Sequence, residues 1–168
     1  MVSNVTETNA QHKDGLNLNL LLEQHHKIQK IIVSQKNVIR GFDFGVAYAD
    51  VRATEKALLV GEGDNFAIYQ VDFGHKETAD ILYYLDASKR VTGFGVSILV
   101  PTNAEEHHLY KDITNYFNER YGKYTINEKN NREWHFGNEY TVEMGDSRDG
   151  DTHAIELEYT KIAKTVKN

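Results

Sequence analysis

Regular alternation of apolar and polar side chains between residues 65 and 160 constrains the fold of this chain more than any other feature. Successive side chains of a β-strand point to opposite faces of a sheet, so alternation is typical of strands with one buried face. The pattern predicts two groups of three strands, at about residues 65–73, 78–86 and 90–100, and at about 124–136, 140–145 and 152–160. Short turns within each group predict antiparallel meanders.

Turn lengths indicate which side chains share a face. A turn of two or four residues after residue 85 places Tyr83 and Phe94 on the same buried face. A two-residue turn at Gly137 would put Trp134 and Val142 on opposite faces, whereas a three-residue loop pairs them. We therefore expect the longer loop.

A strong helix signal separates the two groups of strands. Pro101 ends the third strand, Thr102 or Asn103 can cap a helix that runs to Tyr121, and Gly122 ends it. Helical spacing gives this helix an apolar face that is expected to cover the sheet, formed by Leu109, Ile113, Tyr116 and Phe117.

A shorter helix is predicted at residues 50–59, ended by Gly61 and Gly63. Leu21, Ile28 and Ile32 fall on one helical face within residues 20–38, and so apolar a face needs a partner surface. We expect that segment to dock on its own domain or against a second copy of the chain.

Helices placed between runs of antiparallel strands predict the α+β class, with helices packed on one face of the sheet. A helix followed by three strands occurs twice, from about residues 47 and 103, which indicates a possible structural duplication. We divide the chain into an N-terminal arm and helix at 1–39, a single α+β domain at 40–162 and a tail at 163–168.

The amino-acid composition disfavours some classes of binding partner and a membrane span. Nineteen Lys and Arg against 25 Asp and Glu give a formal charge of -6 with no basic run, which disfavours nucleic acid. Cysteine is absent, and no stretch approaches the ~20 apolar residues of a membrane span. A native Met1 would predict a cytoplasmic protein, whereas removal of a leader would predict the cell envelope or periplasm, so the compartment stays open.

No motif predicts a metal or a cofactor. Two Glu-x-x-His pairs, Glu23 with His26 and Glu105 with His108, resemble ligand pairs of di-iron bundles, but the second is expected to face water. An acidic loop at 145–151 resembles a calcium loop, yet Gly145 stands where the first carboxylate ligand is needed. Nucleotide-binding glycine loops and hydrolase serine turns are not found.

One group of polar side chains is left as a candidate site, on the outward face of the last three strands. A histidine near carboxylates can support acid–base chemistry, although alternation alone also produces such a solvent-exposed face. The candidate residues are Glu133, His135, Thr141, Glu143, Glu156 and Glu158.

Five short segments carry a resemblance that spans about residues 41–162. They are Phe44 with Gly45, Asp50 with Val51, Arg120 to Gly122, Trp134, and Ile155 to Thr160. Together these segments resemble small bacterial domains of the β-lactamase-inhibitor-protein-like type, which repeat a helix and a meander. The resemblance implies a binding role without catalysis and assigns no functional residue.

The sequence therefore predicts a non-enzymatic protein-binding domain of α+β type. Its partner is expected to be another protein or a second copy of the chain, through a homodimer formed by residues 20–38. Two alternatives stay open. The first is a small-ligand carrier with a pocket between helix and sheet, and the second is a small hydrolase or isomerase that uses the Glu and His residues of the outward face.

Overall fold

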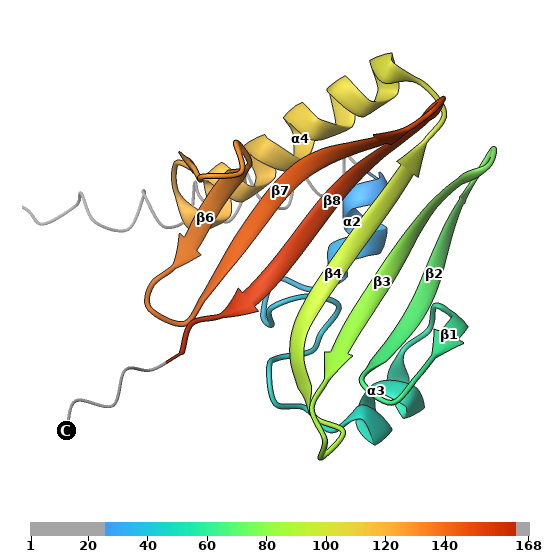
Figure 1. Ribbon diagram of the computed structural model, residues 1–168, viewed down its shortest axis with the longest axis vertical. Helices are drawn as coiled ribbons and strands as arrows, with labels where there is room; N and C mark the ends of the chain where they lie inside the picture. The colour runs from blue at the N-terminus through green and yellow to red at the C-terminus, as the bar shows by residue number, and fades with distance from the viewer. Residues whose placement is uncertain (1–25, 164–168) are drawn as a thin grey trace, which may run out of the picture.

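The computed structural model describes residues 26–163, which form three helices and an eight-stranded antiparallel sheet (Figure 1). The helices are α2 (His26–Ile32), α3 (Tyr48–Thr54) and α4 (Asn103–Tyr121). The strands are β1 (Leu58–Glu62), β2 (Phe66–Gly74), β3 (Glu77–Leu85), β4 (Val91–Val100), β5 (Thr125–Ile126), β6 (Arg132–Phe136), β7 (Tyr140–Asp149) and β8 (Thr152–Lys161).

The strand order is β1-β2-β3-β4-β8-β7-β6-β5, so two four-stranded meanders meet where β4 pairs with β8. One helix precedes each meander, α3 the first and α4 the second. The chain is thus an α+β protein, as predicted. Each unit has four strands after its helix instead of the three expected.

The predicted registers are confirmed. Tyr83 lies opposite Phe94, and Trp134 lies opposite Val142 across the three-residue loop. All four side chains are buried because they point to the face that the helices cover. This side of the sheet holds the core of the protein.

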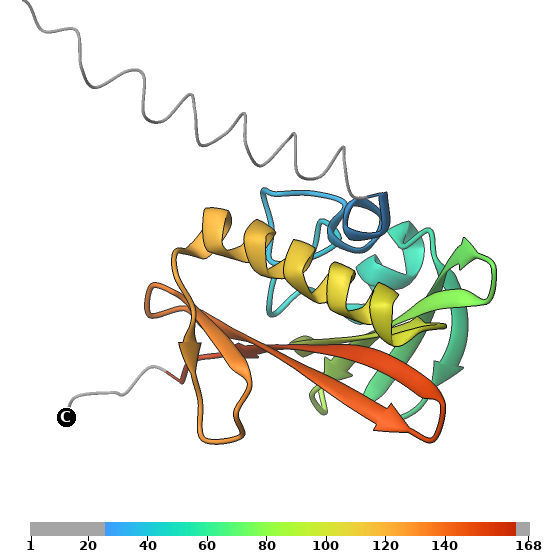
Figure 2. The ribbon, with the colours of Figure 1, turned by 90° about the horizontal axis from the view of Figure 1, so that it is seen from above.

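Helix α4 lies across that covered face, and the opposite face of the sheet is open (Figure 2). Thr102 caps the helix by accepting a hydrogen bond from the Glu105 amide at 3.2 Å, and Gly122 ends it with a φ of 89° that only glycine adopts easily. The ring of Phe117 packs edge-on against Trp134 with 5.1 Å between centroids. The predicted inner face of α4 is buried at all four positions, Leu109, Ile113, Tyr116 and Phe117.

The helix predicted at residues 50–59 is wrong in its second half, where the chain forms strand β1 instead. Helix α3 ends at Thr54 because Glu55 adopts an extended backbone, with its carboxylate bound by Arg40 and Tyr83. Leu59 then pairs with Tyr69 of β2. Pairing with β2 and a long-range ion pair override the local helical pattern.

Two strand boundaries in the second meander also differ from the prediction. The segment at 124–136 is interrupted by a turn in which the Asn127 side chain accepts hydrogen bonds from the Lys129 and Asn131 amides, which separates β5 from β6. Strand β7 extends to Asp149, because the acidic segment after Gly145 pairs with β8 instead of forming a loop.

The N-terminal helix ends earlier than predicted. Residues 1–25 lie outside the described part, and α2 ends at Ile32, where Val33 has a φ of 62°. Ile28 and Ile32 are buried in the core of their own chain. This is the arrangement expected if the segment docks on its own domain. Ile39 is also fully buried, but it reaches the core through a bridge to Phe42 and does not belong to the helix.

Candidate functional site

The predicted site residues lie together on the open face of the sheet, on β6, β7 and β8. Pairing places Glu133 opposite Glu143, and Glu143 opposite Glu158, so that three carboxylates form one row across neighbouring strands. His135 lies opposite Thr141 in the next row. The intervening side chains, such as Val142 and Leu157, are buried on the helical side. The pleat of the strands accounts for this grouping.

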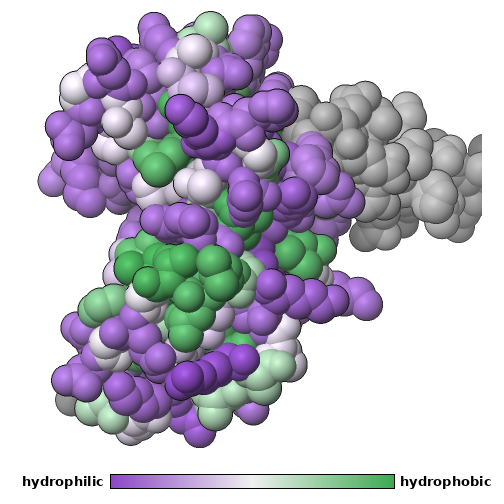
Figure 3. All heavy atoms as spheres, turned by 90° about the vertical axis from the view of Figure 1, so that its right-hand side faces the viewer, coloured by the Kyte–Doolittle hydropathy of each residue, from purple (hydrophilic) through white to green (hydrophobic). Residues whose placement is uncertain are grey.

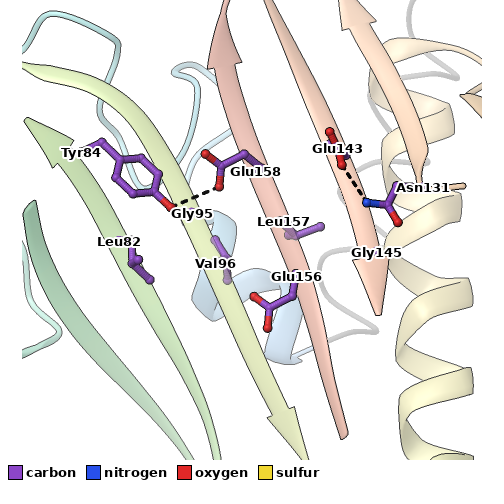
Figure 4. A pocket seen from close by; sticks show the side chains of 10 residues that line it. All are labelled: Leu82, Tyr84, Gly95, Val96, Asn131, Glu143, Gly145, Glu156, Leu157 and Glu158. Atoms are coloured by element: carbon purple, nitrogen blue, oxygen red, sulfur yellow. Dashed lines mark hydrogen bonds between the residues drawn. The ribbon is translucent and has the colours of Figure 1, made fainter. Parts of the chain in front are cut away.

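A hollow of about 110 Å³ opens on this face over strands β3, β4, β7 and β8 (Figure 4). Tyr84 and Leu82 form one wall, and the carboxylates of three Glu residues stand on the other side. The lining residues are Leu82, Tyr84, Gly95, Val96, Asn131, Glu143, Gly145, Glu156, Leu157 and Glu158.

Two glycines make room for the hollow. A Cβ atom at Gly95 would lie 3.0 Å from the Tyr84 hydroxyl and 3.3 Å from a carboxylate oxygen of Glu158. A Cβ atom at Gly145 would lie 2.6 Å from the side-chain oxygen of Asn131, a distance that real side chains do not adopt. Glycine inside a strand often marks such a close approach.

The three carboxylates of the hollow differ in their partners. Glu143 accepts a hydrogen bond from the Asn131 side chain at 2.7 Å and forms an ion pair with Lys129 at 3.2 Å. Glu156 accepts hydrogen bonds from the hydroxyls of Ser97 at 2.9 Å and Ser147 at 3.1 Å.

Glu158 has no ion pair within residues 26–163. Its carboxylate accepts one hydrogen bond, from the Tyr84 hydroxyl at 3.3 Å. Burial is the main cause that raises the pKa of Glu158, and the charge of Glu143 adds to it, against the opposing effect of the Tyr84 hydrogen bond. For Glu143, burial opposes ionisation, but the hydrogen bonds from Asn131 and Lys129 outweigh it and lower the pKa. The surrounding residues therefore stabilise the charge of Glu158 less than that of Glu143.

The other predicted residues lie beside the hollow, not in it. His135 is half-exposed and contacts Glu133 of its own strand, with 2.8 Å between Nε2 and Oε1. Neither residue lines the hollow, and neither does Thr141. The structure thus separates the histidine from the three clustered carboxylates.

Sequence reasoning missed Tyr84, Asn131 and the two glycines. The alternation in residues 78–86 already places Tyr84 on the face opposite Ile81 and Tyr83, so its orientation was accessible. Asn131 directly precedes β6, and the register that pairs Arg132 with Met144 continues to Asn131 and Gly145. The expected three-residue loop at 137–139 therefore made this contact accessible too.

Within residues 26–163, no group of three or more His, Asp or Glu side chains is arranged to hold a metal ion. Of the two Glu-x-x-His pairs, Glu23 lies outside the described residues, and His108 is exposed on α4. The core beneath the helices has a void of about 10 Å³, bordered by Ile28, Ile113 and Phe117 among others, which is no larger than one water molecule. None of the described helices is long and apolar enough to cross a membrane.

The fold and the site define a class: a one-sided antiparallel α+β protein whose open sheet face carries carboxylates around a glycine-floored hollow. No family model, curated protein or solved structure matches the chain significantly. The arrangement of side chains on the open face of the sheet is therefore the basis for a proposed function.

Proposed function

We propose that the protein is a non-enzymatic binding domain and that a partner protein docks on the open face of its sheet. One observation carries the proposal. The helices cover only one face, and the other presents a hollow with an apolar wall and three converging carboxylates (Figure 4). Uncovered sheet faces of this kind present a wide, stable surface to a partner.

The chemistry of the hollow fits a basic side chain of the partner. The apolar stem of a Lys or Arg can lie against Leu82 and the Tyr84 ring, while its charged end meets Glu158. Among the described residues no cation forms an ion pair with Glu158, although the more distant Lys129 favours its charged form. A half-buried carboxylate gains most from a new ion pair in a site that excludes water. The partner surface is therefore basic at this point.

The two alternatives have less support. Catalysis by the Glu and His residues of the open face would need His135 beside the hollow, but its contact is with Glu133. A ligand carrier would need an enclosed cavity between helix and sheet. The void beneath the helices is only about 10 Å³, and the larger hollows beside α4, of about 320 and 390 Å³, are open at the surface.

We also propose kinship with β-lactamase-inhibitor-protein-like domains and a homodimer through residues 20–38. The two helix-plus-meander units support the first, because such domains repeat this unit. Within the described part of 20–38, Ile28, Ile31 and Ile32 face the core of their own chain, so a homodimer would need other residues of that segment.

A titration of the full chain with a short Arg- and Tyr-containing peptide, observed by amide NMR, tests the proposed function. Shifts should concentrate at Gly95 and Gly145 and weaken with added salt. A peptide with Glu in place of Arg should not bind. Shifts confined to α4, or equal binding of both peptides, would contradict the proposal.

The matched variants are Glu158→Gln in the hollow and Glu119→Gln on the exposed side of α4. Loss of a charged hydrogen bond should weaken the peptide by about tenfold in Glu158→Gln and leave Glu119→Gln unchanged. Because the folded state disfavours the charge of Glu158, Glu158→Gln should melt no lower than the wild type. Weaker binding without lost stability separates a binding residue from a structural one.

A further inference from the structure

Strand β1 is a free edge of the sheet. It pairs with β2 on one side, and no backbone hydrogen bond joins its other side to any segment within residues 26–163. The opposite edge is β5, which has only two residues. Free edges are templates for pairing, and proteins usually protect them with charged side chains.

Strand β1 exposes apolar side chains, although charged ones would be expected on an edge strand that is protected from pairing. Leu58 is 68% exposed and Val60 is 47% exposed, the first more than any other large apolar residue described. Phe66 and Ile68 of β2 lie opposite Tyr84 and Leu82 on the open face and continue this apolar surface. Figure 3 shows the hydrophobic patch on the side of the molecule that carries β1 and β2.

We propose that β1 pairs antiparallel with β1 of a second copy and joins the two sheets across a twofold axis. With Leu59 on the axis, Leu58 of each copy lies opposite Val60 of the other, which covers the two most exposed apolar side chains of β1 at once. A twofold interface of this kind is self-complementary and needs no further partner.

Charge favours the antiparallel arrangement. Exposed Lys56 precedes the strand, and exposed Glu62 and Asp64 lie at its other end. Two antiparallel copies bring the basic end of one toward the acidic end of the other, whereas a parallel pair would place like charges together. A bulge between Leu59 and Gly61 limits regular pairing, so the contact between apolar side chains carries much of the association.

This dimer is distinct from the proposed partner site, because its pairing edge lies outside the carboxylates of β7 and β8. Sedimentation velocity of the full chain over a concentration series should show a species of about twice the 19.2 kDa of one chain. Val60→Lys should raise the dissociation constant at least about tenfold, since it replaces the apolar contact with Leu58 of the other copy by a charged side chain. The matched control is Ile126→Lys, an exposed β-branched residue on the opposite edge, and it should leave the dimer unchanged.

The absence of cysteine permits a direct test of the register. Opposed residues of antiparallel strands have Cα atoms about 4.5–5.5 Å apart, within the range of a disulfide. Mild oxidation should therefore link Leu59→Cys into a covalent dimer and leave Ile126→Cys monomeric, with both variants first shown to be folded by thermal melts. A monomeric wild type at every concentration, a dimer indifferent to Val60→Lys, or Leu59→Cys that does not link would each overturn the proposal.

Discussion

Replacing Glu55 by Gln should destabilise the protein more than any other single change of a charge among the described residues. The Glu55 carboxylate is 2% exposed and accepts hydrogen bonds from Arg40 Nε at 2.7 Å and Arg40 Nη2 at 2.5 Å. The Tyr83 hydroxyl also donates to it, at 2.5 Å. This group joins α3, β3 and the segment after α2, so its loss disconnects three parts of the core.

The magnitude follows from the pKa of Glu55. Burial opposes ionisation, but the hydrogen bonds from Arg40 and Tyr83 outweigh it and lower the pKa from 4.5 to about 2. Such a change corresponds to about 3 kcal/mol of stability. Glu55→Gln also leaves the guanidinium of Arg40 buried without its counter-ion, and removal of one partner of a buried pair costs about 3–5 kcal/mol.

The sign of the pH dependence follows from the lowered pKa. The stabilisation by Glu55 is complete above pH 4.5 and is lost as the pH falls toward 2, because the unfolded state binds the proton more tightly. The difference in unfolding free energy between wild type and Glu55→Gln should therefore be largest near pH 7 and shrink in acid.

Urea unfolding, followed by the fluorescence of the single, buried Trp134, measures this difference at each pH. The matched control is Glu62→Gln, whose partner Arg52 is 60% exposed at 3.3 Å, and an exposed pair contributes about 0–1 kcal/mol. Our reasoning would be refuted if Glu55→Gln cost no more than Glu62→Gln, or if its effect did not change with pH.

Two further predictions concern the core and metal ions. Phe117→Ala should lower the free energy of unfolding by about 3–5 kcal/mol, because Phe117 is fully buried against Trp134, whereas Phe136→Ala at a 43% exposed position should cost far less. Similar urea midpoints for the two variants would contradict the assigned packing of α4. Thermal midpoints in EDTA and in excess calcium should agree within error, and a midpoint that rises and saturates with calcium would reveal a site on the protein.

Patterns local to each element determined most of the fold. Period-two alternation predicted five of the eight strands near their positions, and turn length predicted the pairs Tyr83 with Phe94 and Trp134 with Val142. The capping residue and the apolar face of α4 were also readable, since helix ends and amphipathic faces depend on neighbouring residues. The same alternation placed all six candidate residues on one face of the sheet.

Tertiary structure decided the features that depend on distant residues. Glu55 ends α3 because Arg40 and Tyr83 bind its carboxylate from other parts of the chain, and β1 exists because β2 pairs with it. The hollow likewise needs Tyr84 of β3 beside Glu158 of β8, residues far apart in the sequence that the pairing of β4 with β8 brings together. Sequence periodicity specifies which way a side chain points, whereas sheet order and hairpin packing decide which side chains it meets.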